Sequence, residues 1–331
     1  MNKNLIAIAI AAAMAAPGIA SADVKLIGNV QLELVSTSGD ASTGEGITLD
    51  DSFEGGKAGS GNKSGIGAKG SHDLGNGMTG LFKVYLNFSP DNGSGGLGKA
   101  RDMFVGLKGG FGTVLAGRIA TPYKTSTVGW DTFNATFLQA RGNNGRSKLH
   151  NGYADEVIAY ANKFGSAKFV GAIALDESVD ASNSINGEHT ITFSVNMPVA
   201  DNLELALAYL DASAANDGTA IKAGLKWKSG DLTISGQYET LGADITDPNV
   251  AGDQTSLYLN GNMKMGGGAS IQLGFGQLSD DGDGGTTISL GYKNKMSKSV
   301  MAYAGVIAIN DGVLGQGNST TQFGGGVRVG F

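Results

Sequence analysis

The stretch TQFGGGVRVGF at residues 321–331 alternates between two kinds of side chain. Phe323, Val327, Val329 and Phe331 share one parity and are apolar, whereas the other parity is small or polar and carries one charge, Arg328. Consecutive side chains of a β-strand point to opposite faces, so this segment predicts a strand with an apolar and a polar face. Such a strand suits the wall of a transmembrane β-barrel, which is apolar toward lipid and polar toward a water-filled lumen.

The same alternation recurs along the chain, for example over residues 24–34, 82–88, 191–197 and 203–209. About sixteen such segments of roughly ten residues can be counted, and a tilted strand needs that length to cross a bilayer. A soluble β-sandwich also alternates, but its outward positions carry charge, and a parallel β-helix would show a fixed repeat period. The sequence therefore predicts an all-β fold, a transmembrane antiparallel β-barrel of about 16 strands.

The connections between these segments are predicted to alternate in length. Short turns are expected at residues 75–78, 109–112, 164–166, 198–202, 228–230 and 296–298. Longer links rich in Gly, Asp, Asn and Ser are expected at 36–62, 89–99, 121–152, 177–187, 241–252, 279–285 and 310–319. Outer-membrane barrels have short periplasmic turns and long external loops. We expect one barrel domain over residues 23–331.

The N-terminal residues 1–22 predict a cleaved signal peptide. Lys3 precedes an apolar run over residues 5–16, and Ala20 and Ala22 form a small-x-small cleavage site. This order of charge, apolar core and cleavage site is typical of exported proteins, and the run is shorter than the roughly 20 residues of a membrane-spanning helix. We expect an outer-membrane location.

Composition excludes several classes of function. The chain has 55 Gly, 5 Pro and no Cys, so disulfides and thiol catalysis are excluded. Without Lys3, 23 basic residues face 30 acidic ones, a formal net charge of −7, which argues against nucleic acid as a partner. The three histidines have no evident Ser and carboxylate partners in the sequence, so an enzyme is not expected.

Two internal stretches resemble the general porins of Gram-negative outer membranes. The first is SGIGAKG at residues 64–70 with DLGNG at 73–77; the second is RDMFVGLKGGFGTVLAGR at 101–118. GYKNKMSK at 291–298 and the terminal Phe331 extend the resemblance over nearly the whole mature chain. It implies a homotrimer in outer-membrane lipid, inserted by the barrel assembly machinery that recognises the last strand with Phe331.

The resemblance also implies that the third loop, residues 121–152, folds into the lumen and narrows it. Trp130, Phe133 and Phe137 are expected to hold this loop against the wall, with Asp131 as the acidic group at the constriction. Basic residues are expected to complete the pore constriction: Lys69, Lys83, Arg101 and Arg118 from the wall, and Arg141, Arg146 and Lys148 from the loop. The chain departs from the family pattern at Gly65 and Tyr153, where the family usually has Arg.

These residues predict a channel for passive diffusion of small hydrophilic solutes and ions, selected by width, charge and hydrogen-bonding groups. The alternatives are a solute-specific channel and a non-conducting barrel acting as adhesin or anchor, and Lys69 and Arg118 could be ordinary solvated charges. No cofactor or metal is expected. The G-x-G-x-x-G matches at 65–70 and 75–80 open no helix, and the acidic run at 280–283 lacks the glutamate that closes an EF-hand loop.

Overall fold

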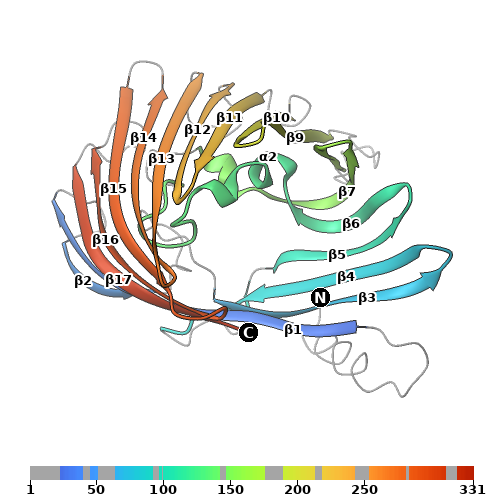
Figure 1. The fold of residues 1–331 in the computed structure, drawn as a ribbon, viewed down its shortest axis with the longest axis horizontal. Helices are drawn as coiled ribbons and strands as arrows, with labels where there is room; N and C mark the ends of the chain where they lie inside the picture. The colour runs from blue at the N-terminus through green and yellow to red at the C-terminus, as the bar shows by residue number, and fades with distance from the viewer. Residues whose placement is uncertain are drawn as a thin grey trace, which may run out of the picture.

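The structure is a computed structural model that describes residues 23–39, 45–50, 64–91, 97–98, 100–141, 147–175, 189–212, 218–242, 253–280, 283–310 and 319–331. The predicted signal peptide lies outside these residues and stays a prediction. Among the described residues, seventeen strands form one sheet. Each strand pairs antiparallel with its neighbours, and β1 pairs with both β17 and β3, so the sheet closes into a barrel (Figure 1). The predicted all-β barrel is confirmed.

The first half of the barrel contains β1 (Asp23–Gly39), β2 (Gly46–Asp50), β3 (Gly65–Gly75), β4 (Met78–Asn87), β5 (Ala100–Gly109), β6 (Gly112–Ala120), β7 (Tyr153–Phe164), β8 (Ala167–Ala174) and β9 (Thr190–Ala200). The second half contains β10 (Leu203–Asp211), β11 (Thr219–Ser229), β12 (Leu232–Leu241), β13 (Gln254–Gly266), β14 (Ala269–Asp280), β15 (Asp283–Lys295), β16 (Val300–Asn310) and β17 (Thr320–Gly330).

Strand β2 was not predicted, because residues 36–62 were interpreted as one long loop. Residues 46–50 of β2 pair with residues 33–37 of β1, while β3 pairs with residues 23–29 of β1. Since β2 and β3 extend along successive parts of β1, the seventeen strands occupy sixteen positions around the barrel. The prediction of about 16 strands therefore agrees with the sixteen strand positions of the barrel.

Short turns join the strands at one end of the barrel, which we call the turn end. Asn76 and Gly77 between β3 and β4 both have positive φ, at 52° and 74°, the conformation of a tight hairpin turn that favours Asn-Gly. Two predicted connections are corrected. Strand β9 continues through Pro198 and ends at Ala200. Strand β14 ends at Asp280 and β15 begins at Asp283, because these two residues are paired directly in the ladder.

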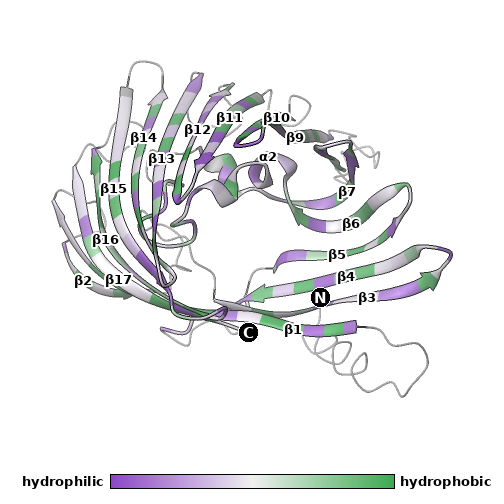
Figure 2. Cartoon of the chain, viewed as in Figure 1, coloured by the Kyte–Doolittle hydropathy of each residue, from purple (hydrophilic) through white to green (hydrophobic). Residues whose placement is uncertain are grey.

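Hydrophilic and hydrophobic residues are interspersed along the strands (Figure 2), and their side chains separate onto two faces of the barrel, as the alternation predicts. Large apolar side chains such as Val105, Leu273 and Phe323 point outward and are 64%, 58% and 65% exposed. Polar residues of the opposite parity, such as Gln31, Glu33 and Glu239, are buried on the inside. Among the residues that the structure describes, no helix is long and apolar enough to cross a membrane.

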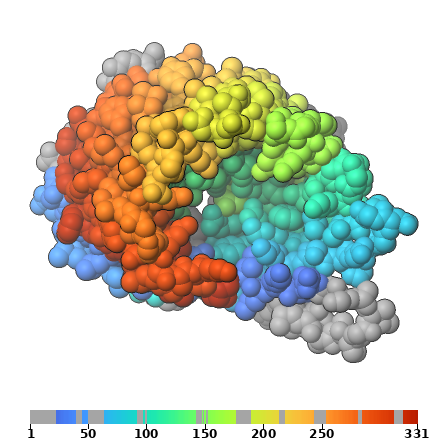
Figure 3. Space-filling view, viewed as in Figure 1, coloured from blue at the N-terminus to red at the C-terminus, as the bar shows by residue number. Residues whose placement is uncertain are grey.

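The segment between β6 and β7 is residues 121–152, and its described residues, 121–141 and 147–152, lie within the ring of strands (Figure 1). It contains helix α2 (Pro122–Thr125) and two short 3-10 turns, η1 (Val128–Trp130) and η2 (Lys148–Asn151). Space-filling atoms leave a narrow opening near the middle of the ring (Figure 3). We call this segment the inner loop; residues 142–146 within it are outside the described residues.

Candidate functional site

The inner loop follows the inside of the barrel strand by strand. Its successive residues bond to side chains on successive strands: Ser126 to Asn196 of β9, Thr127 to Gln237 of β12, Trp130 to Asn260 of β13, Asp131 to Gln272 of β14, Thr132 to Lys293 of β15, Ala135 to Arg328 of β17 and Phe137 to Glu33 of β1. We call β11–β17 and β1 the anchored wall. These contacts fit the expectation of a loop folded into the lumen.

A buried carboxylate fastens both ends of the inner loop to the anchored wall. Glu239 of β12 accepts hydrogen bonds from the Tyr123 hydroxyl (2.9 Å) and the Ser147 hydroxyl (2.7 Å), and the His150 ring Nε2 lies 3.1 Å from its second oxygen. Lys222 of β11 lies directly opposite Glu239 and donates to the Tyr123 carbonyl oxygen at 2.5 Å. A buried carboxylate is tolerated only when hydrogen bonds or an opposite charge compensate it, as these groups do here.

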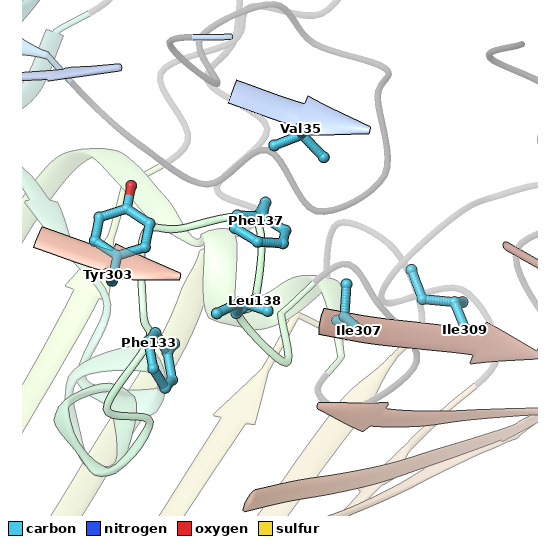
Figure 4. Packing of buried hydrophobic residues seen from close by; sticks show 7 residues of the cluster. All are labelled: Val35, Phe133, Phe137, Leu138, Tyr303, Ile307 and Ile309. Carbon is cyan, nitrogen blue, oxygen red and sulfur yellow. The ribbon is translucent and has the colours of Figure 1, made fainter. Parts of the chain in front are cut away.

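A second anchor holds the middle of the inner loop. Glu33 of β1 accepts from the Phe137 backbone N–H at 3.0 Å and from the Tyr303 hydroxyl at 2.5 Å. Phe133, Phe137 and Leu138 pack with wall side chains in a buried apolar cluster, whose other members are Val35, Tyr303, Ile307 and Ile309 (Figure 4). Polar and apolar contacts therefore fix this part of the loop together.

The aromatic residues of the inner loop sit on glycines of the wall. A Cβ at Gly291 would come within 2.4 Å of the Phe133 ring, and one at Gly224 within 2.8 Å of the Trp130 ring. A glycine at these positions lets the ring approach the sheet. The prediction that Trp130, Phe133 and Phe137 hold the loop against the wall is confirmed.

Two predicted constriction residues serve the inner loop itself. Asp131 is buried and accepts from the backbone N–H groups of Phe133 and Ala140 at 2.9 and 3.0 Å, so it does not supply a free acidic group to the pore as predicted. Arg141 is buried too, and donates to the His150 carbonyl oxygen at 3.2 Å and to Gln139 at 3.1 Å. Both charges stabilise the loop conformation rather than face the opening.

Four other predicted residues lie on the wall that the inner loop leaves uncovered, β3–β6, which we call the open wall. Lys69 of β3 is exposed. Lys83 of β4 pairs with Asp102 at 2.5 Å, and Arg118 of β6 pairs with Asp155 at 2.6 Å. Arg101 of β5 donates to the Tyr153 hydroxyl at 2.9 Å. Arg146 lies outside the described residues, as does the side chain of Lys148, and both stay predictions.

Two guanidinium groups and one amine surround the ring of Tyr153, a group that the sequence does not single out. Arg101, Arg118 and the Lys124 amine lie 5.4, 5.7 and 3.9 Å from the ring centre. Lys124 is 3% exposed. Burial, with a further contribution from the nearby cations Arg141 and Arg101, lowers the pKa of Lys124 to about 6. The position of Tyr153, where the family usually has Arg, was the signal that could have found this group.

Comparison with known families gives one match over most of the chain. A family model described as Gram-negative porin matches residues 9–312. The major outer membrane protein P.IB of Neisseria gonorrhoeae is 34% identical over 148 residues, which cover 43% of this chain and 40% of that protein. Its counterpart from Neisseria meningitidis is 37% identical over 135 residues, which cover 40% and 39%. These matches span about two fifths of each relative's length.

Solved structures match the whole barrel. The anion-selective porin from Comamonas acidovorans superposes with a TM-score of 0.73 at 23% identity, covering 94% of this chain and 100% of that one. The trimer form of OmpT from Vibrio cholerae superposes with a TM-score of 0.68 at 16% identity, covering 94% and 100%. At these identities the likeness shows the fold.

Proposed function

Because the chain belongs to the Gram-negative porin family, we propose that it forms a water-filled channel in the outer membrane for passive diffusion of small hydrophilic solutes and ions. The observation that carries this proposal is the closed barrel with an apolar outer face and a polar inner face. In this proposal the opening between the inner loop and the open wall is the constriction of the path. A channel of this kind has no need of catalysis or a cofactor.

We further propose that the channel prefers anions. In this proposal Lys69, Lys83, Arg101 and Arg118 of the open wall supply the positive charge beside the opening, while the carboxylates that pair with Lys83 and Arg118 are Asp102 and Asp155. Asp155 has a side chain that is 69% exposed, so water screens its effect on Arg118. Fixed positive charge in a narrow aqueous passage raises the local concentration of anions. The Comamonas acidovorans porin, named as anion-selective, shares this fold.

The protein is also proposed to assemble as a homotrimer with its turn end toward the periplasm. The trimer form of Vibrio cholerae OmpT, which shares the fold, supports this proposal. Insertion by the barrel assembly machinery through Phe331 is part of the same proposal. Phe331 is 55% exposed and exchanges both backbone hydrogen bonds with Gly28 at 3.0 Å. Gel mobility before and after heating tests the trimer.

Single-channel recording in a planar bilayer tests the channel and its preference. Ohmic steps are expected, and under a salt gradient the reversal potential should lie toward the equilibrium potential of the anion. The double variant R101Q/R118Q should move the reversal potential toward zero. The control K264Q/K295Q removes the same charge from β13 and β15, away from the open wall, and should change it less. Folded protein that conducts nothing would refute the channel, and an unchanged reversal potential in R101Q/R118Q would refute this source of selectivity.

A further inference from the structure

A pocket of about 390 Å³ opens at the turn end of the barrel. Lysines from three strands line it: Lys163 of β7, Lys168 of β8, and Lys226 and Lys228 of β11. Ser166 and Asn196 add hydrogen-bonding groups, and the acidic residues of the lining are Asp201 and Glu204. We call it the turn-end pocket. It lies at the small end of the size range of ligand sites in proteins.

The strand register places these side chains on the inner face. Lys163 is directly opposite Lys168, Lys168 is directly opposite Asn196, and Glu204 is directly opposite Lys226. Residues directly opposite in an antiparallel pair share a face of the sheet. Asn196 donates to the Ser126 carbonyl oxygen of the inner loop at 2.9 Å, so the pocket opens toward the lumen.

The charges of the turn-end pocket are not balanced within it. Glu204 pairs with Lys226 at 2.5 Å, but the exposed ammonium groups of Lys163, Lys168 and Lys228 have no such partner among the described residues. Lys163 and Lys168 are directly opposite, so their Cβ atoms are about 5 Å apart. Two like charges in this position destabilise a sheet. An anion between the two lysines would remove this repulsion.

We propose that the turn-end pocket is a binding site for small multivalent oxyanions, solutes that carry two or more phosphate or carboxylate groups. Lysine suits such ligands because its ammonium is a compact charge with three donors. Lys163 and Lys168 would bind one anionic group and Lys228 another, while Lys226 stays paired with Glu204. Ser166 and Asn196 would hydrogen-bond to the ligand oxygens.

The pocket also adjoins the anchored part of the inner loop. The Lys226 ammonium lies 4.9 Å from the ring of Trp130, and Glu204 accepts from Asn196 at 3.2 Å. A ligand held by these strands would therefore lie on the turn-end side of Ser126 and Trp130. Solutes that leave through the turn end would pass it. An anion bound there would slow the current of other anions from that side.

Binding of inorganic tripolyphosphate to the purified full-length protein in nonionic detergent tests the proposal by calorimetry. We expect saturable binding of one probe per chain, at least about tenfold weaker in K163Q/K168Q, because each charged contact contributes more than a neutral one. K264Q/K295Q is the control with the same loss of charge at the turn end outside the pocket, and it should bind like the wild type. Circular dichroism verifies the fold of every variant.

The same measurement separates this site from the proposed constriction. R101Q/R118Q should keep the probe affinity and lose the anion preference of the channel, whereas K163Q/K168Q should keep ohmic conduction and lose the affinity. Loss of binding in R101Q/R118Q with retention in K163Q/K168Q would overturn the turn-end pocket and assign the probe to the constriction. Equal weakening in K163Q/K168Q and K264Q/K295Q, or no saturable binding, would also overturn it.

Discussion

The anchored wall and the open wall carry similar charged residues in opposite settings. On the anchored wall Lys222 and Glu239 are fully buried and bonded to the inner loop. On the open wall Lys69 is exposed, and Lys83 is paired with a carboxylate that remains partly exposed. The same residue types thus fix the loop on one side and line the proposed channel on the other. The difference is whether the inner loop covers them.

Removing the buried carboxylate Glu239 should detach the inner loop from the anchored wall. This change has the largest expected effect. In E239A, Tyr123, Ser147 and His150 lose their shared partner, and Lys222 loses the charge that balances it. Breaking a buried ion pair costs about 3–5 kcal/mol, so the urea midpoint measured by circular dichroism should fall. Single-channel conductance should rise, because the inner loop is released at both ends.

The control for E239A is D253A. Asp253 is an exposed carboxylate just before β13, and surface substitutions change stability by about 0.5 kcal/mol or less. An E239A variant with wild-type stability and wild-type conductance would contradict the role given to this anchor. Lower stability with unchanged conductance would show that the loop stays in place without it.

Alternation was sufficient to predict the barrel, since each strand has a period of two and a polar inner face. It could not predict β2, because this strand has only five residues and is recognised by its pairing with β1. Nor could it place the ends of β14 and β15, where the ladder carries Asp280 and Asp283, residues typical of turns. Cross-strand pairing decided these boundaries, and sequence patterns do not show it.

The site was predicted in part. The aromatic anchors were found because large apolar residues in a long polar loop need a surface to pack on. Asp131 was assigned to the pore, although an aspartate two residues before a backbone N–H often accepts from it, as Asp131 does from Phe133. That spacing was a readable signal. The pairing of Lys222 with the inner loop joins residues 99 positions apart and had no signal in the sequence.

The buried amine of Lys124 should make the open wall sensitive to pH. Its pKa of about 6 lies below the ordinary value of 10.5, so the amine is mostly neutral at pH 7.5 and charged at pH 5. Protonation adds a positive charge beside Arg101 and Arg118. The reversal potential should therefore move further toward anion selectivity as the pH falls from 7.5 to 5, while K124M should lack this part of the shift.

The same shift affects stability in a definite direction. The unfolded chain holds the Lys124 proton up to about pH 10.4, whereas the folded protein releases it near pH 6. Since the unfolded state binds more protons between these values, stability should rise with pH through this window. K124M should flatten that slope. A wild type and K124M with identical pH profiles of reversal potential would contradict a titrating amine next to Tyr153.

The smallest expected effect concerns a row of lysines that crosses three neighbouring strands. Lys25, Lys69 and Lys83 are directly opposite one another across β1, β3 and β4, and like charges in this arrangement destabilise a sheet by about 0.2–1 kcal/mol. K69Q should therefore raise the urea midpoint slightly and weaken anion preference. K83Q should raise it less or lower it, because Asp102 then loses its partner at 2.5 Å. If K69Q lowered stability instead, packing of the lysine stems would outweigh the repulsion between their charges. The row would then be no evidence that positive charge on the open wall is kept at a cost in stability.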